Sequence, residues 1–468
     1  MKLTFINKQV LVLGLGDTGL SVLRWLSSQG AVLSVADTRE APPGLELLRK
    51  ELPQVKVHLG PFTDEAFAEA ELVVASPGVP LSEPQVKAAI KRGVQVVGDI
   101  ELFAQYKAPS ARVIAITGSN GKSTVTMLVG EMCKAAGLKA VVAGNIGLPV
   151  LDALVQEKTS GVPDVYVLEL SSFQLETTHS LVPNAATVLN ISEDHMDRYS
   201  SLADYAGAKM RIFHGSGIQV LNRQDDWSRN MALPGRKVIT FGTDLPPSAE
   251  DFGMLPGDDT WLMHGSTGLI RTQEMHIPGL HNISNALAAF ALCHAIGLEF
   301  APLVNALRHF KGLPHRVEWV AEIAGVTFYD DSKGTNVGAT CAALSGLAPE
   351  GNDGKVILIA GGDGKGQDFA PLKAPVAQSA RAVVLIGKDA GLIARELKDT
   401  GIPLLHTASL EEAVRIAHSV ARARDAVLLS PACASFDMFR NYVHRAEVFV
   451  DAVKQLKSQA RPRPEAAA

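Results

Sequence analysis

An apolar strand that runs directly into a glycine-rich turn is the feature of this sequence that most restricts its fold. Residues 113–124 read Val-Ile-Ala-Ile-Thr-Gly-Ser-Asn-Gly-Lys-Ser-Thr. Such a turn aims several backbone N–H groups into one concavity, and the helix behind it adds partial positive charge, so the site suits phosphate. The motif needs a buried strand before it and a helix after it, which we expect over residues 123–136. It therefore predicts an α/β fold.

The side chains of this turn predict ATP as the ligand. Lys122 can reach the terminal phosphates of a nucleotide, and Ser123 or Thr124 can offer a hydroxyl to Mg²⁺. The spacing Gly118-x-x-Gly121-Lys-Ser is two residues shorter than the usual phosphate loop. The competing interpretation is an ordinary strand-to-helix turn with a solvated lysine. We favour ATP because the strand, the turn and the helix all occur where the motif requires them.

The whole chain alternates short β-branched strands with helical stretches, which favours parallel sheets built from βαβ units. Its 468 residues suffice for two or three domains. We predict three: a Rossmann-like domain at 1–106, a phosphate-loop domain with a mostly parallel sheet at 107–313, and a second Rossmann-like domain at 314–468. Strands are expected at 9–13, 32–36, 55–58, 72–75, 94–97, 165–170, 186–189, 326–329, 355–360, 383–386, 404–406 and 426–429. Helices are expected at 202–213 and 439–456, and a disordered tail at 458–468.

Composition excludes several classes of protein. The net charge of -5 argues against a general nucleic-acid binder, which would carry a basic face. The four cysteines form no Cys-x-x-Cys pair, so we expect reduced core residues rather than a zinc or disulfide framework. No run of about 18 apolar residues is present, so we expect no membrane span. These features predict a cytoplasmic protein.

The first domain opens with Gly14-x-Gly16-x-x-Gly19 directly after a strand, and Asp37 ends the next strand. This is the spacing of a dinucleotide-binding turn, in which Asp37 would accept a hydrogen bond from a ribose hydroxyl. A NAD-dependent dehydrogenase is therefore one competing interpretation, and a turn that only packs helix on sheet is another. Two observations weaken the dehydrogenase interpretation. The chain has a separate ATP-type loop, and the glycine turn requires only a pyrophosphate-bearing nucleotide, not nicotinamide. The residues expected at the same sheet edge are Thr38, Arg39 and residues 76–80.

The second domain carries polar groups with the character of a metal site. Glu169 ends a strand and would face the phosphate loop, where a Mg²⁺ ligand belongs. Residues 190–198, Asn-Ile-Ser-Glu-Asp-His-Met-Asp-Arg, follow the next strand and could bind a second metal or substrate. A solvated acidic loop with a hydrogen-bonded His195 is the alternative. Lys209 lies among apolar residues and could lose its proton and react with CO₂. From the residues alone, a lysine whose amino group reaches solvent is the favoured interpretation.

Further motifs lie at 144–147, 169–176, 193–198, 279–286, 312–318, 330–336, 361–365 and 430–437. Together with the phosphate loop they span essentially the whole chain, and this set resembles the Mur ligase family. The motifs of the third domain resemble those of the members that add D-glutamate. The Asp-Asn-Pro-Arg signature of the members that add diaminopimelate or lysine is absent from the sequence. Gly334 stands where these relatives usually have alanine, a departure expected to affect loop freedom rather than chemistry.

The resemblance implies an ATP-dependent ligation of D-glutamate to UDP-N-acetylmuramoyl-L-alanine, a step of peptidoglycan precursor synthesis. ATP would phosphorylate the L-alanine carboxylate, and the amine of D-glutamate would attack the acyl phosphate and release phosphate. Catalysis would then be mainly positioning and charge neutralisation. The alternatives are a folylpolyglutamate synthetase-like ligase, which shares only the central domain, and a nicotinamide-dependent oxidoreductase. A monomer is expected.

The family's site residues carry over to this sequence as expectations. Those for the UDP-sugar substrate are Leu15, Gly16, Asp17, Thr18, Gly19, Asp37, Thr38, Arg39, Gly78, Asn145 and His195. Those for ATP are Gly118, Ser119, Asn120, Gly121, Lys122, Ser123, Thr124, Asn282, Asn285, Arg316 and Asp331. Those for D-glutamate are Lys333, Thr335, Lys365, Ser435 and Phe436. One Mg²⁺ would be held by Ser123 and Glu169, and a second by His195 and a carbamylated Lys209. The catalytic residues would be Lys122, Glu169, His195 and Lys209.

Overall fold

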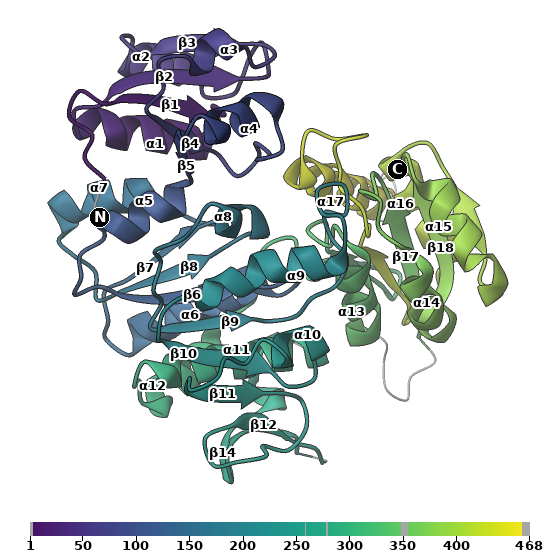
Figure 1. Ribbon diagram of the computed structural model, residues 1–468. Helices are drawn as coiled ribbons and strands as arrows, with labels where there is room; N and C mark the ends of the chain where they lie inside the picture. The colour runs from purple at the N-terminus through teal and green to yellow at the C-terminus, as the bar shows by residue number, and fades with distance from the viewer. Residues whose placement is uncertain (1–2, 258, 278, 348–353, 461–468) are drawn as a thin grey trace, which may run out of the picture. The chain divides into compact units, whose positions relative to one another are not determined.

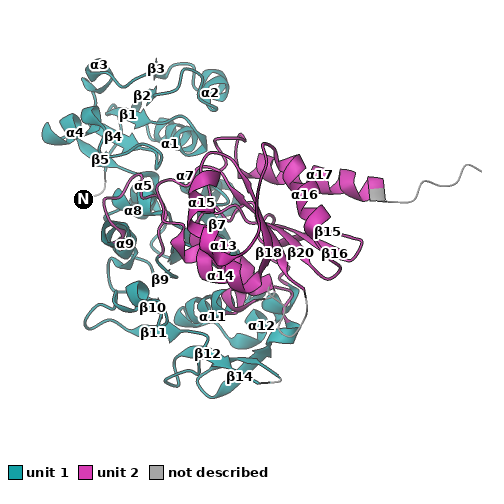
Figure 2. Cartoon of the chain, turned by 90° about the vertical axis from the view of Figure 1, so that its right-hand side faces the viewer, with its two compact units in different colours: residues 1–191, 203–274, 284–309 teal, residues 192–202, 275–283, 310–468 magenta. Residues whose placement is uncertain are grey.

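The computed structural model describes residues 3–257, 259–277, 279–347 and 354–460. The chain forms two compact units (Figure 2). The first unit comprises residues 1–191, 203–274 and 284–309, and the second comprises residues 192–202, 275–283 and 310–468. Two short segments from the middle of the sequence therefore belong to the second unit. No helix in the described ranges is both long and apolar enough to cross a bilayer.

The first sheet of the first unit is built from residues 9–97 (Figure 1). Its strands and connecting helices, together with α5, which follows the last strand, are β1 (Gln9–Leu13), α1 (Asp17–Ser28), β2 (Val32–Asp37), α2 (Leu45–Glu51), β3 (Lys56–Leu59), α3 (Asp64–Phe67), β4 (Leu72–Ala75), α4 (Pro84–Lys91), β5 (Gln95–Val97) and α5 (Asp99–Tyr106). The five strands are parallel and ordered β3-β2-β1-β4-β5. This order brings the turn after β1 beside the loop after β4, at the point where the strand order reverses.

The second sheet of the first unit has nine strands in the order β14-β13-β12-β11-β10-β9-β6-β8-β7. The elements of this region are β6 (Arg112–Thr117), α6 (Lys122–Ala135), β7 (Ala140–Gly144), α7 (Val150–Ser160), β8 (Val165–Glu169), α8 (Ser172–Glu176), β9 (Ala185–Val188), α9 (Leu202–Met210), η1 (Arg211–Phe213), β10 (Ile218–Asn222), α10 (Asp226–Arg229), β11 (Val238–Phe241), β12 (Phe252–Leu255), β13 (Trp261–His264), β14 (Thr267–Arg271), η2 (Thr272–Glu274), α11 (Leu280–Ala295) and α12 (Phe300–His309). The strands β6 to β12 all pair in parallel, whereas β13 pairs antiparallel with both β12 and β14. The sheet is thus mostly parallel, as predicted, with an antiparallel edge.

The second unit contains the third sheet, of six strands in the order β15-β16-β20-β17-β18-β19. Its elements are β15 (Glu318–Ile323), β16 (Val326–Asp330), α13 (Val337–Leu347), β17 (Val356–Gly361), η3 (Ala370–Leu372), α14 (Lys373–Ser379), β18 (Ala380–Ile386), α15 (Ala390–Leu397), η4 (Lys398–Thr400), β19 (Leu404–His406), α16 (Leu410–Val420), β20 (Ala426–Leu429) and α17 (Tyr442–Ala460). All pairs are parallel except β15 with β16.

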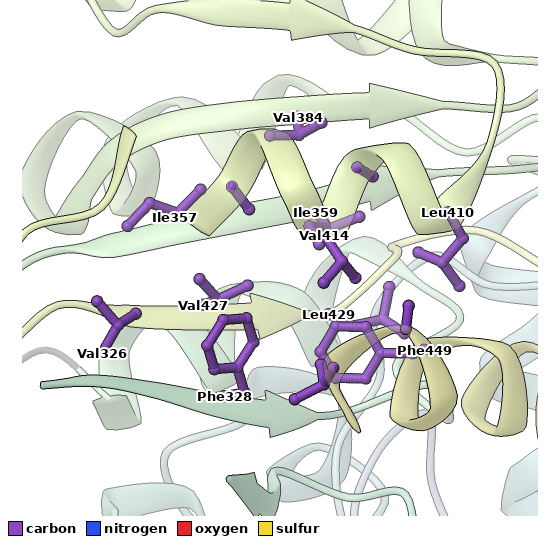
Figure 3. Close-up of a cluster of buried hydrophobic side chains, with 14 of the residues drawn as sticks. Val326, Phe328, Ile357, Ile359, Val384, Leu410, Val414, Val427, Leu429 and Phe449 are labelled. Carbon is purple, nitrogen blue, oxygen red and sulfur yellow. The ribbon is translucent and has the colours of Figure 1, made fainter. Parts of the chain in front are cut away.

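Both faces of this third sheet are covered by helices, so its central strands are apolar on both sides. All six residues of β17 are buried. Ile357 and Ile359 pack on one face with residues of α16 and α17, in the cluster that Figure 3 shows. Val356, Leu358 and Ala360 pack on the other face with residues of α13, α14 and α15. The β-branched runs of the sequence form these strands because each residue finds an apolar neighbour.

The predicted α/β fold is confirmed, and most predicted strands agree within two residues. The last helix differs from its prediction, because it begins at Tyr442 rather than Phe439 and continues to Ala460. The side chain of Asn441 accepts a hydrogen bond from the backbone N–H of His444 (2.9 Å), which is the geometry of an N-cap. The predicted disordered tail was therefore wrong for residues 458–460, and 461–468 lie outside the described residues.

Candidate active site

The phosphate loop adopts the predicted strand, turn and helix. β6 ends at Thr117 and α6 begins at Lys122, with Gly121 between them at φ 83°. A Cβ on Gly121 would lie only 2.4 Å from the side-chain oxygen of Asn285, so no larger residue fits there without a shift. Asn285 of α11 is thereby placed against the loop, which is where a residue predicted to contact ATP should lie.

Asn190 holds the tip of the loop from the neighbouring strand. Its backbone oxygen accepts from the Ser119 N–H (2.9 Å), and its side-chain oxygen accepts from the Asn120 N–H (2.8 Å). These contacts arise because β9 pairs with β6 in register, with Thr117 opposite Val188. The loop is therefore fixed before any ligand binds, which reduces the entropy lost on binding.

Two lysines converge on one carbonyl of the loop. The Lys122 ammonium donates to the Gly118 oxygen (2.8 Å) and the Ser119 oxygen (2.9 Å). The Lys209 ammonium donates to the same Gly118 oxygen (2.9 Å), lies 3.3 Å from the Thr117 hydroxyl and stands 4.6 Å from the centroid of the Tyr205 ring. The Lys122 ammonium beside a turn of backbone N–H groups makes this a site suited to a multiply charged anion.

The burial of Lys209 corrects one expectation. From the residues alone, its amino group was expected to reach solvent, but the residue is only 1% exposed. Burying an ammonium is costly unless polar groups surround it, and here the loop carbonyl, a hydroxyl and an aromatic face do so. The carbonyl and the hydroxyl lie about 90 residues away in sequence, so no local pattern could reveal them.

Glu169 has the contacts expected of a metal ligand. It ends β8, pairs in register with Ile116 of β6 and is 1% exposed. One carboxylate oxygen accepts from the Asn145 side chain (2.7 Å), and the other is buried with no hydrogen-bond partner in the described chain. Because an unpaired buried carboxylate oxygen is strongly unfavourable, the residue fits a bound cation such as Mg²⁺.

The glycine turn after β1 is tied to Asp37. This carboxylate accepts from the Leu15 N–H (2.7 Å), from the Arg39 N–H (2.9 Å) and from the Arg39 guanidinium at both oxygens (2.9 and 2.7 Å). Burial acts to raise the pKa of Asp37, but these hydrogen bonds outweigh it and lower the pKa overall. Its acceptor positions are filled by the protein, unlike those of an aspartate that binds a ribose hydroxyl in a dinucleotide fold.

Residues from the two sheets of the first unit line one cavity of about 360 Å³. Asp17 and Thr18 begin α1, directly after the glycine turn, and Asn145 comes from the loop after β7. Asn145 also contacts Glu169, so the cavity connects the first-sheet turn to the candidate metal ligand. Of the other residues expected to bind the same substrate, Gly16 precedes α1, Gly19 lies in its first turn, Thr38 follows β2 and Gly78 lies in the loop after β4. His195 belongs to the second unit.

Asp99, at the start of α5, is a buried carboxyl beside the loop that follows Glu169. It is 3% exposed, one oxygen has no hydrogen-bond partner among the described residues, and the Gln174 amide is 3.5 Å from the other. Ser171 is the N-cap of α8 and forms a capping box with Gln174, in which each side chain accepts a hydrogen bond from the other's backbone N–H. Burial raises the pKa of Asp99 to about 6, against hydrogen bonds that favour the carboxylate.

We expect Asp99→Asn to stabilise the protein at pH 8 but not at pH 4. A pKa raised in the folded state means that ionisation opposes folding, so the cost to the wild type appears as pH rises through about 6. The shift from 3.8 corresponds to about 3 kcal/mol in the free energy of unfolding. Urea unfolding at both pH values measures it, with the exposed Asp64→Asn as control. A gain that does not depend on pH would contradict the prediction.

In the second unit, the loops after β16, β20 and β17 are fastened together. The Ala432 N–H donates to the Gly334 oxygen (3.0 Å), and Asp363 and Ala434 exchange two backbone hydrogen bonds (3.1 and 2.8 Å). These strands are neighbours in the sheet, so their carboxyl ends meet at one edge. The residues predicted to bind D-glutamate, which are Lys333, Thr335, Lys365, Ser435 and Phe436, all lie in these loops.

These predicted residues differ in environment. The Lys333 ammonium lies 5.5 Å from the centroid of the Tyr442 ring. Lys365 forms an ion pair with Asp194, which also accepts from the Asn336 side chain (3.2 Å). Ser435 is 3% exposed, whereas Phe436 is 77% exposed.

His195 belongs to the same unit as Lys365 and follows Asp194 directly. Its backbone is left-handed (φ 59°), and its Nε2 lies 3.8 Å from the Asp194 carboxylate. The other residues predicted to bind metal, Ser123, Glu169 and Lys209, belong to the first unit.

A second cavity, of about 300 Å³, is lined by His281, Asn282, Arg316 and Trp319 among others. Asn282 and Arg316 were both predicted to bind ATP, so the structure brings these two together. Burial and the charge of Arg316 lower the pKa of His281 to about 4, so the imidazole is neutral at pH 7. Its lining combines apolar and aromatic side chains such as Leu313 and Trp319 with the polar groups of Asn282 and Arg316, so the cavity is suited to a partly polar group such as a nucleotide base.

Asp331 is 4% exposed beside this region, and burial raises its pKa to about 7 despite a hydrogen bond from the Ser430 hydroxyl (2.6 Å) and the charge of Arg316. The departure at Gly334 has a consequence here. A Cβ on Gly334 would lie 2.4 Å from the Asp331 carboxylate and 2.8 Å from the Ser430 hydroxyl. The expectation that this glycine affects loop freedom was therefore incomplete, because it also makes room for the Asp331–Ser430 contact.

Some residues of these sites were missed from the sequence. They are Asn190, which fixes the phosphate loop; Tyr205, which covers Lys209; His315, whose Nδ1 is 2.7 Å from Asp330; Tyr442, beside Lys333; and Arg445, buried behind the loops. Asn190 and His315 stood within the quoted motifs and could have been found there. Tyr205, Tyr442 and Arg445 lie in helices, where nothing in the local pattern separates them from core residues.

Three family models match consecutive parts of the chain. They are described as Mur ligase MurD-like, N-terminal domain, over residues 8–98; Mur ligase middle domain, over 116–293; and Mur ligase, glutamate ligase domain, over 315–433. Together they cover most of the sequence.

Two curated relatives that align over nearly the full chain carry the same name. A UDP-N-acetylmuramoylalanine–D-glutamate ligase of Methylobacillus flagellatus is 64% identical over 97% of this chain and 98% of its own length. One of Thiobacillus denitrificans is 58% identical over 97% of both chains. The crystal structure of UDP-N-acetylmuramate-alanine ligase MurC from Thermotoga maritima aligns with a TM-score of 0.61 at 19% identity, over 96% of this chain and all of that chain. The last similarity concerns the fold alone.

Proposed function

The chain belongs to the Mur ligase family, and from this we propose that it is an ATP-dependent ligase that joins D-glutamate to UDP-N-acetylmuramoyl-L-alanine. The observation that carries the proposal is the 64% identity, over nearly the full length of both chains, to a ligase named for these two substrates. Such an enzyme makes a peptidoglycan precursor and releases ADP and phosphate. A folylpolyglutamate synthetase-like ligase and a nicotinamide-dependent oxidoreductase are not favoured.

We assign the UDP-sugar substrate to residues 1–106, ATP to 107–313 and D-glutamate to 314–468. The cavity that joins Asp17 and Thr18 to Asn145 supports the first assignment, since these residues were predicted for one ligand. The rigid phosphate loop with Lys122 supports the second. Because every substrate has its residues on this one chain, we propose that the enzyme acts as a monomer.

The chemistry follows from the charges around the phosphate loop. The terminal phosphoryl group of ATP is transferred to the L-alanine carboxylate, so two anions must be brought together. Lys122 would hold the phosphoryl oxygens, and the loop N–H groups would hold the phosphates behind it. The D-glutamate amine then attacks the acyl carbon of the mixed anhydride, the tetrahedral adduct loses phosphate, and the amine proton passes to solvent or a nearby base.

Mur ligases use Mg²⁺ together with ATP. The residues that would hold it here are Ser123 and Glu169, whose unpartnered buried oxygen fits a cation. Bound Mg²⁺ would offset phosphate charge during the transfer. We propose that a second ion is held by His195 and by Lys209 as a carbamate.

The test of this function is an assay of ADP release with the purified full-length chain. We expect release only when ATP, the UDP-sugar peptide and D-glutamate are all present. L-Glutamate, D-glutamine and meso-diaminopimelate should be poor acceptors, because a site of buried donors rejects a ligand without the matching oxygens by about 10⁴-fold. Lys333→Ala should raise the apparent KM for D-glutamate about tenfold to a hundredfold, since it removes a charged hydrogen-bond donor.

The matched control for this variant is Lys373→Ala, an exposed lysine of the same unit that pairs with Glu396. It should leave all three KM values unchanged. Loss of UDP-sugar binding in Lys333→Ala, or ligation of diaminopimelate as fast as D-glutamate, would contradict the assignment of the third sheet to the amino acid.

A further inference from the structure

Arg445 is the largest side chain that the second unit buries completely. It is 1% exposed, and no carboxylate among the described residues lies within ion-pair distance of it. Burial lowers its pKa to about 10, against weaker attraction from the carboxylates of Asp330, Asp331 and Asp437. A guanidinium buried without a direct counter-ion is costly, so its contacts must serve a purpose that a leucine would not.

Those contacts join two loops. One guanidinium nitrogen donates to the Ser332 oxygen (2.8 Å) and the other to the Cys433 oxygen (3.2 Å), while the Nε has no partner among the described residues. Ser332 immediately precedes Lys333, and Cys433 lies two residues before Ser435. The planar guanidinium therefore spans the loop after β16 and the loop after β20.

The helix that carries Arg445 is itself firmly anchored. Phe449 lies one turn later on the same face of α17 and packs in the cluster with Leu410 and Leu429 (Figure 3). Leu429 is the last residue of β20, so the anchor holds the helix beside the start of the β20 loop. The position of the guanidinium is thus set by the core rather than by the loops it contacts.

We propose that Arg445 is a positioning residue for the acidic acceptor. It fixes the spacing between the Lys333 loop and the Ser435 loop, so that the two carboxylates of the amino acid meet their donors together. This inference rests on the proposed function, which assigns Lys333 and Ser435 to D-glutamate. A lysine at this position would keep the charge but could not reach both carbonyls with a rigid fork.

The test compares Arg445→Met and Arg445→Lys with wild type, using the full-length chain and steady-state kinetics in each substrate. We expect the methionine variant to raise the KM for D-glutamate about tenfold or more, with the KM values for ATP and the UDP-sugar within about twofold. The lysine variant should give a smaller rise of about threefold or more. Thermal unfolding is measured for every variant.

The matched control is Arg381→Met. Arg381 holds the buried Asp425 through two hydrogen bonds (2.5 and 2.9 Å) near the amino ends of β18 and β20, away from the loops. It should lower the unfolding temperature without changing the KM for D-glutamate.

If Arg445→Met behaves like this control, or raises all three KM values equally, the role is structural and the inference is wrong. If Arg445→Met does not fold, an unchanged KM in Arg445→Lys overturns the inference by itself. A wild-type chain that does not ligate D-glutamate would overturn the proposed function and this inference together.

Discussion

Replacing Lys122 with alanine is expected to lower kcat by on the order of 10³-fold while leaving the fold intact. The variant removes the charge that would hold the transferring phosphoryl group, and such contacts are worth several kcal/mol in the transition state. The loop should survive, because Asn190 and Lys209 still hold Ser119, Asn120 and Gly118. ADP release and thermal unfolding are measured on the same preparation.

Lys134→Ala is the control for this variant, since Lys134 lies on the same helix in an exposed pair with Glu131. It should keep wild-type activity. Turnover near the wild-type rate in a folded Lys122→Ala protein would contradict the assignment of the loop to ATP.

Replacing Lys209 with alanine is expected to abolish activity, and a short-chain carboxylic acid in the buffer should restore part of it. In the proposed active form the neutral amine has attacked CO₂, forming a C–N bond as one C–O π bond opens and a proton leaves to water. The resulting carbamate offers two oxygens to a metal ion, whereas the ammonium offers none. A free carboxylate that enters the vacated space would supply the same oxygens.

The specificity of this rescue distinguishes a missing ligand from a damaged fold. Lys122 contacts the same loop carbonyl as Lys209. The activity of Lys122→Ala should not be restored by carboxylic acids, because this variant lacks a cation rather than an anion. An alanine variant of Lys209 that keeps full activity in CO₂-free buffer would rule out the carbamate. Labelling the wild type with ¹³CO₂ and observing a carbamate carbon by NMR tests the modification directly.

The helices and strands predicted correctly from the sequence are those that a contiguous run of residues is enough to specify. The phosphate loop was found because strand, glycine turn and helix are contiguous, and β20 and β19 were placed at their observed bounds because short apolar runs end at polar residues. Strands β7 and β15, and those from β10 to β14, were missed. Each is only four to six residues long, and the apolar pattern of so short a run does not distinguish a strand from a loop or a buried helix segment.

Residues of the candidate site could be predicted where they lie in motifs, but their surroundings could not. Glu169 and Lys333 lie in recognisable segments, but the environment of each comes from elsewhere in the chain. The buried state of Lys209 depends on Gly118, 91 residues away, and the ion pair of Lys365 depends on Asp194, 171 residues away. Such contacts are products of the tertiary fold, and a single sequence carries no record of them.

The interleaving of the two compact units restricts how this protein can be divided or recombined. A fragment that begins at residue 314 would lack residues 192–202 and 275–283, which belong to the same unit. It would lose Asp194, the partner of Lys365, and with His281 and Asn282 it would lose one wall of the 300 Å³ cavity. An exchange of C-terminal halves between related enzymes would therefore succeed only if both internal segments moved with the half they serve.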